Sequence, residues 1–386
     1  MKIVLKIVLA LLVLAILGFF FVFPGYMMRS VNVVLDREPY VPSQRAVELH
    51  KTLFIADLHC DALLWNRDLL KRSNVGHVDI PRLSEGNVAL QAFTIVSKVP
   101  PGLNIERNEA KHDLITLLVI AQRWPFSTWG SLKARAVYQS QKLQRFAEKS
   151  ENTFFVIRSR KDLQDYFERR KTDPKITAGF LGAEGAQVLE GDIANLDDLF
   201  NAGIRMMAPT HFFDNEVAGS AHGVKKGGLT DLGRAMIREM EKRRMIIDLA
   251  HASAKTIDDV LAMVTRPVVV SHTGVRGTCD NTRNLSDQQI RGIAATGGVI
   301  GIGYWETAVC GKDAKAIVAA MKYVANLVGV EHIALGSDFD GGVTEPFDTT
   351  GLIEITDELL KAGFSEQDIR LIMGENVLRL LLDTLP

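Results

Sequence analysis

The sequence has little cysteine and no excess of charge of either sign. Its 386 residues include three cysteines, Cys60, Cys279 and Cys310, which are too few and too scattered for a disulfide framework or a Cys-x-x-Cys zinc site. They do not fix the redox compartment. The formal net charge is −1, so the composition gives no reason to expect a nucleic acid partner.

The chain also lacks a Gly-x-Gly-x-x-Gly motif after its first predicted strand, which argues against a dinucleotide-binding open sheet. Apolar residues are plentiful, at 47% of the total, and can fill a sizeable core. A chain of 386 residues suits one large α/β domain or two smaller ones.

The longest apolar run lies near the N-terminus, from Ile7 to Phe23, and follows Lys2 and Lys6. Its 17 residues are few for a membrane-spanning helix and rather many for a cleaved signal peptide. The phenylalanines before Pro24 do not suit signal peptidase, which prefers small residues. We therefore expect an uncleaved signal anchor over 1–24, with a cleaved signal peptide as the alternative. The positive-inside rule then places the chain from about residue 30 onward outside the cytoplasm, in a periplasmic or extracellular space.

Short apolar runs alternate with amphipathic segments after a polar linker that we expect over 25–50. Strands are predicted at 53–56, 88–96, 176–181, 204–208, 245–249, 267–271, 298–303 and 332–336. Helices are predicted at 62–72, 105–123, 131–149, 195–202, 230–243, 253–265, 286–296, 312–328, 350–362 and 365–382. This alternation predicts a parallel sheet, and eight strands favour a closed, TIM-like (β/α)₈ barrel over 51–386. An open doubly wound sheet is the second choice.

Side chains that can bind metals follow most of these strands. They are His59, Asp61, Glu184, His211, His251, His272 and Asp338. Barrel enzymes place their chemistry at the carboxyl ends of the strands, so these side chains should converge. Imidazoles and carboxylates suit zinc. Two metals ~3.5–4 Å apart need a bridging ligand, and Glu184 is the natural candidate.

Each of these residues also has an ordinary structural interpretation. A single histidine at a strand end more often forms a hydrogen bond to a loop than binds a metal. Asp338 or Asp340 could form a turn with the following glycines. The joint pattern outweighs these interpretations. The other histidines do not combine a strand end with a partner, and we interpret them as structural: His50, His77, His112, His222 and His332. Cys60 points away from its two neighbours and is predicted to pack in the core.

From about residue 53 to its end, the chain resembles the membrane (renal) dipeptidase family. The likeness is carried, in order, by Asp57-Leu58-His59-Cys60-Asp61, Glu184-Gly185, Thr210-His211, Ile247-Asp248-Leu249-Ala250-His251, Val270-Ser271-His272, Arg283-Asn284-Leu285-Ser286-Asp287 and Gly336-Ser337-Asp338-Phe339-Asp340-Gly341. The resemblance implies a binuclear zinc hydrolase on a distorted (β/α)₈ barrel that cleaves dipeptides.

The resemblance also implies a set of metal ligands. His59 and Asp61 would bind one zinc ion, and His251 and His272 the other, with Glu184 as the bridge between them. The cofactor would thus be two Zn²⁺ ions per chain.

Three further residues would handle the substrate. His211 would stabilise the tetrahedral intermediate, Arg283 would hold the free carboxylate of the dipeptide, and Asp338 would bind the free amine or transfer the proton. The chain departs from the family at Cys60, where asparagine is common, and over 98–150, which has little similarity. Its C-terminal apolar tail is too short for a lipid-anchor signal.

The predicted function is therefore zinc-dependent hydrolysis of dipeptides with a free C-terminal carboxylate, including those with a D-residue in second place. Another binuclear amidohydrolase, acting on N-acyl or cyclic amides, would use a similar metal site but would not need Arg283. A non-catalytic metal-binding or adhesive membrane protein would not need a complete ligand set. A phosphotriesterase-like enzyme usually carries a bridging lysine where this chain has Glu184. A homodimer is an open prediction.

Overall fold

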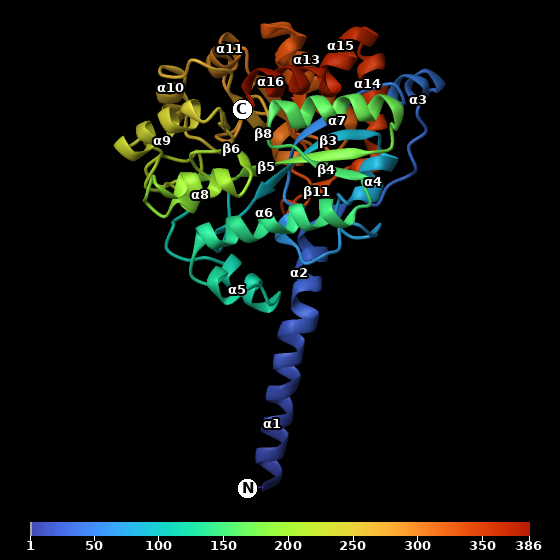
Figure 1. Ribbon diagram of the computed structural model, residues 1–386. Coiled ribbons are helices and arrows are strands. Elements are labelled where there is room, and N and C mark those ends of the chain that lie inside the picture. Colours follow the sequence, from blue (N-terminus) through green and yellow to red (C-terminus); the bar gives the residue numbers. More distant parts are fainter. Residues whose placement is uncertain (1) are drawn as a thin grey trace.

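The eight predicted strands form a curled parallel sheet in the computed structural model, which describes residues 2–386 (Figure 1). Its strand order is β7-β6-β5-β3-β2-β10-β9-β8. The bounds are β2 Ile55–Cys60, β3 Val88–Ile95, β5 Thr177–Ala183, β6 Ile204–Met207, β7 Ile246–Ile247, β8 Val269–Thr273, β9 Val299–Ile302 and β10 Ile333–Leu335. A parallel bridge between Asp248 and Val269 joins the two ends of the sheet. The predicted TIM-like fold is confirmed, in a distorted form whose closure rests on this bridge.

Burial explains why the strands form where they do. Every residue of β2 and of β3 is buried, as expected of parallel strands covered by helices on their outer face and by side chains within. One further strand of this sheet was not predicted: β4, Phe154–Val156, pairs with the first half of β5. Its three residues are too few to show a periodic pattern in the sequence.

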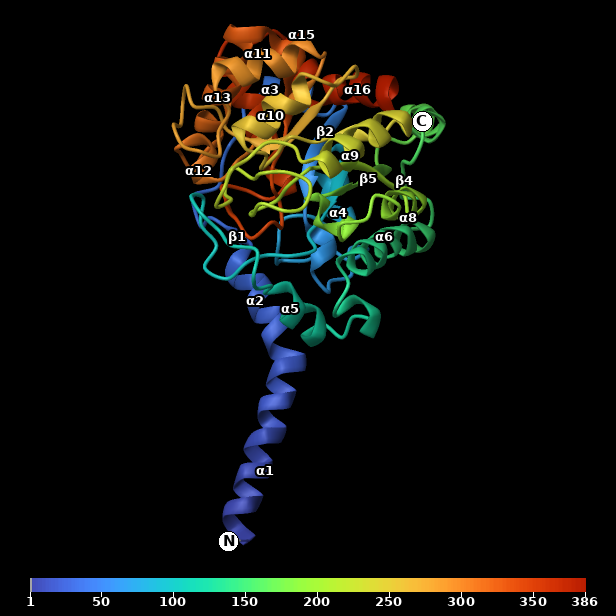
Figure 2. The same ribbon diagram turned by 90° about the vertical axis from the view of Figure 1, so that its left-hand side faces the viewer.

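The helices cover the outside of this sheet (Figures 1 and 2). They are α4 Ile80–Glu85, α5 Ile115–Ala121, α6 Leu132–Lys149, α7 Arg160–Thr172, α8 Asn195–Asn201, α9 Asp231–Lys242, α10 Ala254–Leu261, α11 Asp287–Ala295, α12 Glu306–Val309, α13 Ala314–Val328, α14 Ile353–Lys361, α15 Glu366–Arg370 and α16 Asn376–Thr384. In α9 the buried residues Gly233, Met236, Ile237 and Met240 recur at helical spacing. Thr230 caps this helix by accepting a hydrogen bond from Gly233 N.

Two predicted helices are shorter than expected. The helix predicted over 105–123 begins only at Ile115, because Asn104 and Asn108 bond the backbone of the preceding loop. The helix predicted over 62–72 is a single 3₁₀ turn, Ala62–Leu64. There Lys142 Nζ donates to the carbonyls of Leu63 and Trp65, so this backbone is held by tertiary contacts instead.

A continuous helix of 30 residues, Lys2–Val31, projects from the domain. It comprises α1 Lys2–Leu17, a π-helical turn Gly18–Val22 and α2 Phe23–Val31. Its most apolar window has a mean hydropathy of 3.0 with no residue buried, so by length and composition it could cross a membrane. The stretch predicted as a linker also contains β1 Val33–Val34, paired with β11 Thr344–Glu345, and the short helix α3 Gln44–His50.

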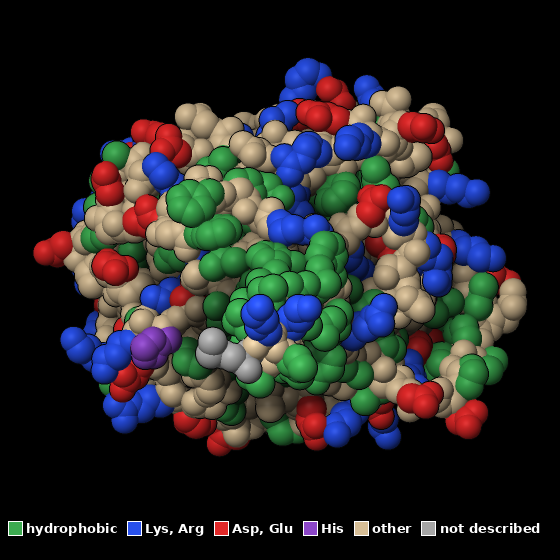
Figure 3. Space-filling view, turned by 90° about the horizontal axis from the view of Figure 1, so that it is seen from below, with side chains coloured by type: hydrophobic (Ala, Val, Ile, Leu, Met, Phe, Trp, Pro, Cys, Tyr) green, Lys and Arg blue, Asp and Glu red, His purple; other side chains and the backbone are tan. Residues whose placement is uncertain are grey.

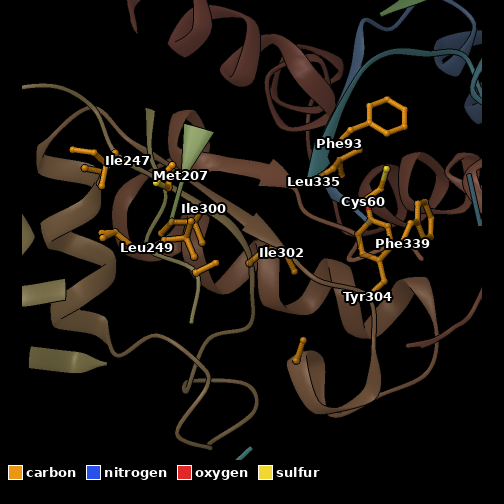
Figure 4. Close-up of a cluster of buried hydrophobic side chains, with 14 of the residues drawn as sticks. Cys60, Phe93, Met207, Ile247, Leu249, Ile300, Ile302, Tyr304, Leu335 and Phe339 are labelled. Carbon is orange, nitrogen blue, oxygen red and sulfur yellow. The ribbon is translucent and has the colours of Figure 1, made fainter. Parts of the chain in front are cut away.

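The cysteines behave in two ways. Cys279 and Cys310 form a disulfide across 31 residues of sequence, a single bond that the sequence did not predict. They meet because the segments after β8 and β9 lie side by side. Cys60 is the free cysteine of residues 2–386 and is buried, as predicted. It packs in the core next to Phe93 and Phe339 (Figure 4).

Candidate active site

All seven strand-end side chains come together at the carboxyl end of the barrel. His59 and His272 lie within β2 and β8, Asp61 and Glu184 directly follow β2 and β5, and the other three lie three or four residues beyond β6, β7 and β10. The strands are parallel, so side chains far apart in sequence reach one edge of the sheet.

Glu184 lies at the centre of the cluster. Its Oε1 is 3.0 Å from His251 Nε2, 3.5 Å from His272 Nε2 and 3.6 Å from His59 Nε2. Its other oxygen, Oε2, is 3.3 Å from His211 Nε2. One carboxylate therefore reaches four imidazoles from four different strands, which is the geometry that a bridging ligand requires.

Three overlapping groups of side chains could hold a metal ion, each with its ligand atoms within 4.8 Å of one another. The groups are His59, Glu184 and His272; Glu184, His211 and His251; and His59, Asp61 and Asp338. His59 and His272 share a group, whereas the resemblance assigned them to different ions. Imidazole nitrogens with carboxylate oxygens are a donor set that suits a divalent metal such as zinc.

Two features of the histidine nitrogens indicate that the residues present suit a cation. His59 Nε2 is fully buried and has no hydrogen-bond partner among residues 2–386. The Nε2 atoms of His251 and His272 are 2.9 Å apart, so at least one presents a lone pair rather than a proton. Nitrogen lone pairs that face buried carboxylates leave room for a positive ion between them.

The pKa shifts of the cluster also indicate a site for a cation. Burial raises the pKa of Glu184 well above its ordinary value and lowers the pKa of His211, His251 and His272 well below theirs. Burial alone would also lower the pKa of His59, but the carboxylates of Glu184, Asp61 and Asp338 raise it to about 10. The site thus crowds several carboxylates into a buried space and favours an added positive charge.

Ser271 orients two of the histidines. Its hydroxyl lies 3.1 Å from His59 Nδ1 and 3.0 Å from His272 Nδ1. With both Nδ1 atoms engaged there, both Nε2 atoms are directed toward Glu184. Such partners commonly fix the ring orientation of a metal-binding histidine. The sequence marked Ser271 only as part of a motif, because its contact with His59 spans 212 residues.

Asp338 completes the carboxylates of the cluster. Its Oδ1 is 3.7 Å from His59 Nε2, and burial raises its pKa to about 8. Asp338 and His251 both have a positive φ, of 64° and 61°. Backbone in this region is unfavourable for residues other than glycine, and it is often found at functional sites.

Arg283 comes from the loop between β8 and α11 and is buried beside the cluster. Its Nη2 donates to the carbonyl of His272 at 2.7 Å, and it forms no ion pair within residues 2–386. Its guanidinium carbon lies 5.9 Å from the ring centre of Trp305. Burial lowers its pKa to about 10, so it remains charged at neutral pH. A buried guanidinium without a carboxylate partner is a site for an anionic ligand.

A cavity of about 760 Å³ opens over these residues. Asp61, Glu184, His211, Arg283 and Asp338 are among the residues that line it. The disulfide braces the cavity, since it joins the loop of Arg283 to the segment after Trp305.

The sequence analysis missed His222, which also lines the cavity. Its ring lies 5.0 Å from that of His251, and its Nδ1 is 2.8 Å from the carbonyl of Ile105. His222 lies in a long irregular loop that no pattern in the sequence places near the strand ends.

Comparisons with known proteins agree with this site. Residues 43–384 match the membrane dipeptidase family, peptidase family M19. The dipeptidase aclJ of Aspergillus oryzae is 27% identical over 350 residues, which cover 85% of this chain and 78% of that protein. An uncharacterized protein from the pqqA 5′ region of Klebsiella pneumoniae is 30% identical over 230 residues, or 55% of this chain and 84% of that protein.

Two solved structures share the fold. A metallopeptidase from Rhodobacter sphaeroides, liganded with a phosphinate mimic of the dipeptide L-Ala-D-Ala, superimposes with a TM-score of 0.70 at 23% identity and covers 86% of this chain and 99% of its own. The probable dipeptidase PvdM from Pseudomonas aeruginosa gives a TM-score of 0.73 at 21% identity, with coverages of 88% and 98%. The match over residues 43–384, together with the metal-binding cluster at the barrel mouth, shows that the chain belongs to the membrane dipeptidase family, peptidase family M19, and is a metallo-dipeptidase.

Proposed function

We propose that this metallo-dipeptidase holds two zinc ions and hydrolyses dipeptides with a free C-terminal carboxylate. The observation that carries the proposal is the central position of Glu184, whose two oxygens reach imidazoles on both sides of the site. His59 and Asp61 would hold one ion and His251 and His272 the other, as the family resemblance implies. The chemistry that a bound zinc pair supplies is activation of a water molecule for attack on the peptide carbonyl.

The chain's own residues would orient the substrate and move the proton. A carboxyl with a pKa of about 8, as in Asp338, can take a proton near neutral pH and return it to the leaving amine. His211 is neutral at pH 7, because burial lowers its pKa, and it keeps one N–H to donate to the developing oxyanion. Arg283 would bind the C-terminal carboxylate with the N–H groups that face the cavity.

The same proposal extends to dipeptides with a D-residue in second place. It is supported by the ligand of the Rhodobacter sphaeroides relative, a mimic of L-Ala-D-Ala. A site that reads the two charged ends of a dipeptide depends less on the configuration of the second side chain than on the distance between those ends. A panel of dipeptides with L- and D-residues in second place tests this extension.

We also propose that residues 2–31 are an uncleaved anchor with the catalytic domain outside the cytoplasm. The length and hydropathy of this helix support the anchor, and Lys2 and Lys6 support its orientation. The disulfide between Cys279 and Cys310 adds support, since such bonds persist mainly in oxidising compartments. N-terminal sequencing of mature protein tests the anchor, and a start after residue 24 would show cleavage. Formation of a homodimer stays a prediction, which a measurement of the molecular mass of the protein in detergent tests.

The experiment that tests the catalytic proposal combines metal analysis with two substrates. Purified protein should carry close to two zinc ions per chain, and Glu184→Ala should lose activity and most of the metal. Full metal content in that variant would remove Glu184 from its bridging role.

The second arm compares a free dipeptide with its C-terminal amide. Arg283→Ala should lower kcat/KM for the free dipeptide. The loss of transition-state stabilisation should be about 2–5 kcal/mol, as when a buried charge loses its partner. Arg283→Lys should recover part of this loss, because an ammonium cannot form the planar fork. The amide should be a poor substrate and lose far less. Equal losses would assign Arg283 to the fold, and activity on N-acyl amino acids alone would favour the amidohydrolase alternative.

A further inference from the structure

Four exposed apolar side chains gather at the base of the catalytic domain. Residues 32–386 expose seven large hydrophobic side chains, and four of them lie between 103 and 126: Leu103, Leu114, Leu117 and Phe126. We call these four residues the collar. Phe126 is 80% exposed, and its ring lies 4.9 Å from that of Trp129. Apolar side chains grouped in this way mark a contact surface, whereas single ones are ordinary.

The collar lies beside the N-terminal helix. Helix α5, which carries Leu117, packs against both α2 and the turn Gly18–Val22. The guanidinium carbon of Arg123, just after α5, lies 4.9 Å from the ring centre of Phe21. Figures 1 and 2 both show α5 next to α2, where the helix leaves the domain. Figure 3 views this base and shows hydrophobic side chains around the helix, with Lys and Arg side chains near them.

The length of the helix sets the depth at which the collar lies. About 20 helical residues span a hydrocarbon core ~30 Å thick. If Lys6 marks one boundary, ~20 residues place the other near Tyr26. Phe21 is therefore still within the apolar span, and Arg123 and α5 contact the helix at that level. The exposed side of α5 then lies at the boundary between hydrocarbon and head groups.

The residues around this level suit such a boundary. Phe126 and Trp129 form an aromatic pair after α5, and Tyr26 is an exposed aromatic residue of the helix at this level. Aromatic rings are enriched at membrane interfaces. Arg29 and Arg123 add cations next to the helix, where lipid head groups carry phosphate.

Three of the four collar residues, Leu103, Leu114 and Leu117, also line the catalytic cavity. Phe23, Met27 and Val31 of α2 form part of the cavity wall, and Leu103 and Leu117 form another part. Glu184 and Asp338 line the same cavity. The cavity thus extends from the catalytic cluster to a wall made by the N-terminal helix.

We propose that the collar rests in the interface of the lipid bilayer, so that the catalytic cavity opens at the membrane surface. This inference rests on the proposed membrane anchor and names a second contact between the protein and lipid. The domain is then held against the bilayer in one orientation rather than swinging on its helix. Dipeptides reach the cavity along the membrane surface, past apolar side chains of the helix and the collar.

The test uses full-length protein in nanodiscs of phosphatidylcholine and phosphatidylglycerol. Cys60 is buried and the other cysteines form a disulfide, so a single introduced cysteine takes an environment-sensitive nitrobenzoxadiazole label. The collar variants are Leu117→Cys and Phe126→Cys. Leu12→Cys, in the apolar helix, reports insertion. Val41→Cys is the matched control, since Val41 is an apolar side chain that is 86% exposed and precedes α3 by three residues. Figure 1 shows α3 on the side of the domain away from α1.

Lipids that carry a quencher near the head group then separate the outcomes. The labels at 117 and 126 should be blue-shifted and quenched several-fold more than the label at 41. If the label at 12 is quenched and the labels at 117 and 126 are not, the helix is inserted but the collar does not contact lipid, which contradicts the proposal. Quenching at none of the positions overturns both the collar contact and the anchor. Thermal melting of each labelled variant confirms its fold, and Phe126, which does not line the cavity, decides the outcome if the label at 117 disturbs it.

Discussion

Asp338 and Asp340 lie two residues apart in one loop, yet their surroundings make them opposite kinds of acid. Both follow β10, and both have a positive φ, of 64° and 63°. Burial raises the pKa of Asp338 to about 8, with Asp61 adding to the rise. Burial would raise the pKa of Asp340 as well, but Arg67 and His77 hold it at about 2. Distance along the chain therefore says little about the role of a carboxylate, whereas the charges that face it decide that role.

The contacts of Asp340 show what a structural carboxylate needs. It forms an ion pair with Arg67, accepts from His77 N at 2.8 Å, and its carbonyl accepts from Trp65 Nε1 at 2.8 Å. These contacts tie the loop after β10 to the segment after β2. Among residues 2–386, Asp338 forms no ion pair with a lysine or arginine, and its Oδ1 lies 3.7 Å from Nε2 of His59, a candidate metal ligand. Asp340 thus holds the loop in place, and we expect Asp338, which the same loop carries, to be the reactive carboxylate.

The strongest test of this contrast is Asp338→Asn. Loss of a general acid–base group should lower kcat/KM for dipeptides on the order of 10³–10⁴-fold. The melting temperature should not fall, because the change removes one carboxylate from a crowded buried cluster. Steady-state kinetics and calorimetry on the same preparation measure both quantities. A lower melting temperature with unchanged kcat/KM would reverse the assignment.

Asp340→Asn should do the opposite. It leaves Arg67 buried without its partner, which should lower the free energy of unfolding by about 3–5 kcal/mol. The exposed pair of Asp68 and Lys71 provides a matched control, and Asp68→Asn should cost less than about 1 kcal/mol. Urea unfolding of the three proteins gives these values. If Asp340→Asn is as stable as the control, the ion pair does not support the loop.

Lys142 extends the comparison to a buried cation that faces no carboxylate. Its Nζ donates to the carbonyls of Leu63 and Trp65, and burial lowers its pKa to about 7. Between about pH 7 and 10.5 the unfolded chain binds a proton at this lysine that the folded chain does not. Stability should therefore rise with pH in this window, by roughly 3 kcal/mol between pH 7.5 and 10.

Lys142→Met should remove this part of the pH dependence. Unfolding curves of the variant and of the unaltered protein at several pH values give the two slopes, and their difference isolates the lysine from other titrating groups. Equal slopes would mean that Lys142 is charged in the folded protein at pH 9.

Ser271→Ala should have the smallest effect. It removes the hydroxyl between His59 Nδ1 and His272 Nδ1 without changing a proposed ligand. Metal affinity should fall by about 10–100-fold, as for other partners of metal-binding histidines. Competition with a chelator measures affinity independently of activity. Ser271→Thr keeps a hydroxyl and should recover part of the loss, and unchanged affinity in Ser271→Ala would exclude the orienting role.

Much of the fold and of the site could be predicted from the sequence, because the patterns concerned are local. Apolar runs of strand length located each of the eight barrel strands within a few residues, and His, Asp or Glu follows six of them. The same runs identified the side chains that now surround Glu184. The family resemblance pointed to Asp338 rather than Asp340, but the pairing of Asp340 could not be predicted, since Arg67 and His77 reach it across more than 260 residues.

The features that were missed near the site depend on contacts made by loops. Cys279 pairs with Cys310, and His222 approaches His251, only because the segments beyond the strand ends fold over one cavity. The loop before Ile115 is not helical because asparagine side chains bond its backbone. Such contacts carry no periodicity, and so no pattern within a short window predicts them.

By itself the sequence determined the class of the barrel, the order of its ligand-bearing strands and the apolar helix at the N-terminus, since each follows from hydrophobic periodicity or from composition within a few residues. Only the tertiary structure decided that α5 lies against that helix, that Phe23 and Leu117 border the same cavity as Glu184, and that one of two neighbouring aspartates is paired and the other is not. The physical reason is that charge and burial act through space. A carboxylate responds to what lies within a few ångströms of it, and the chain must fold before those neighbours exist.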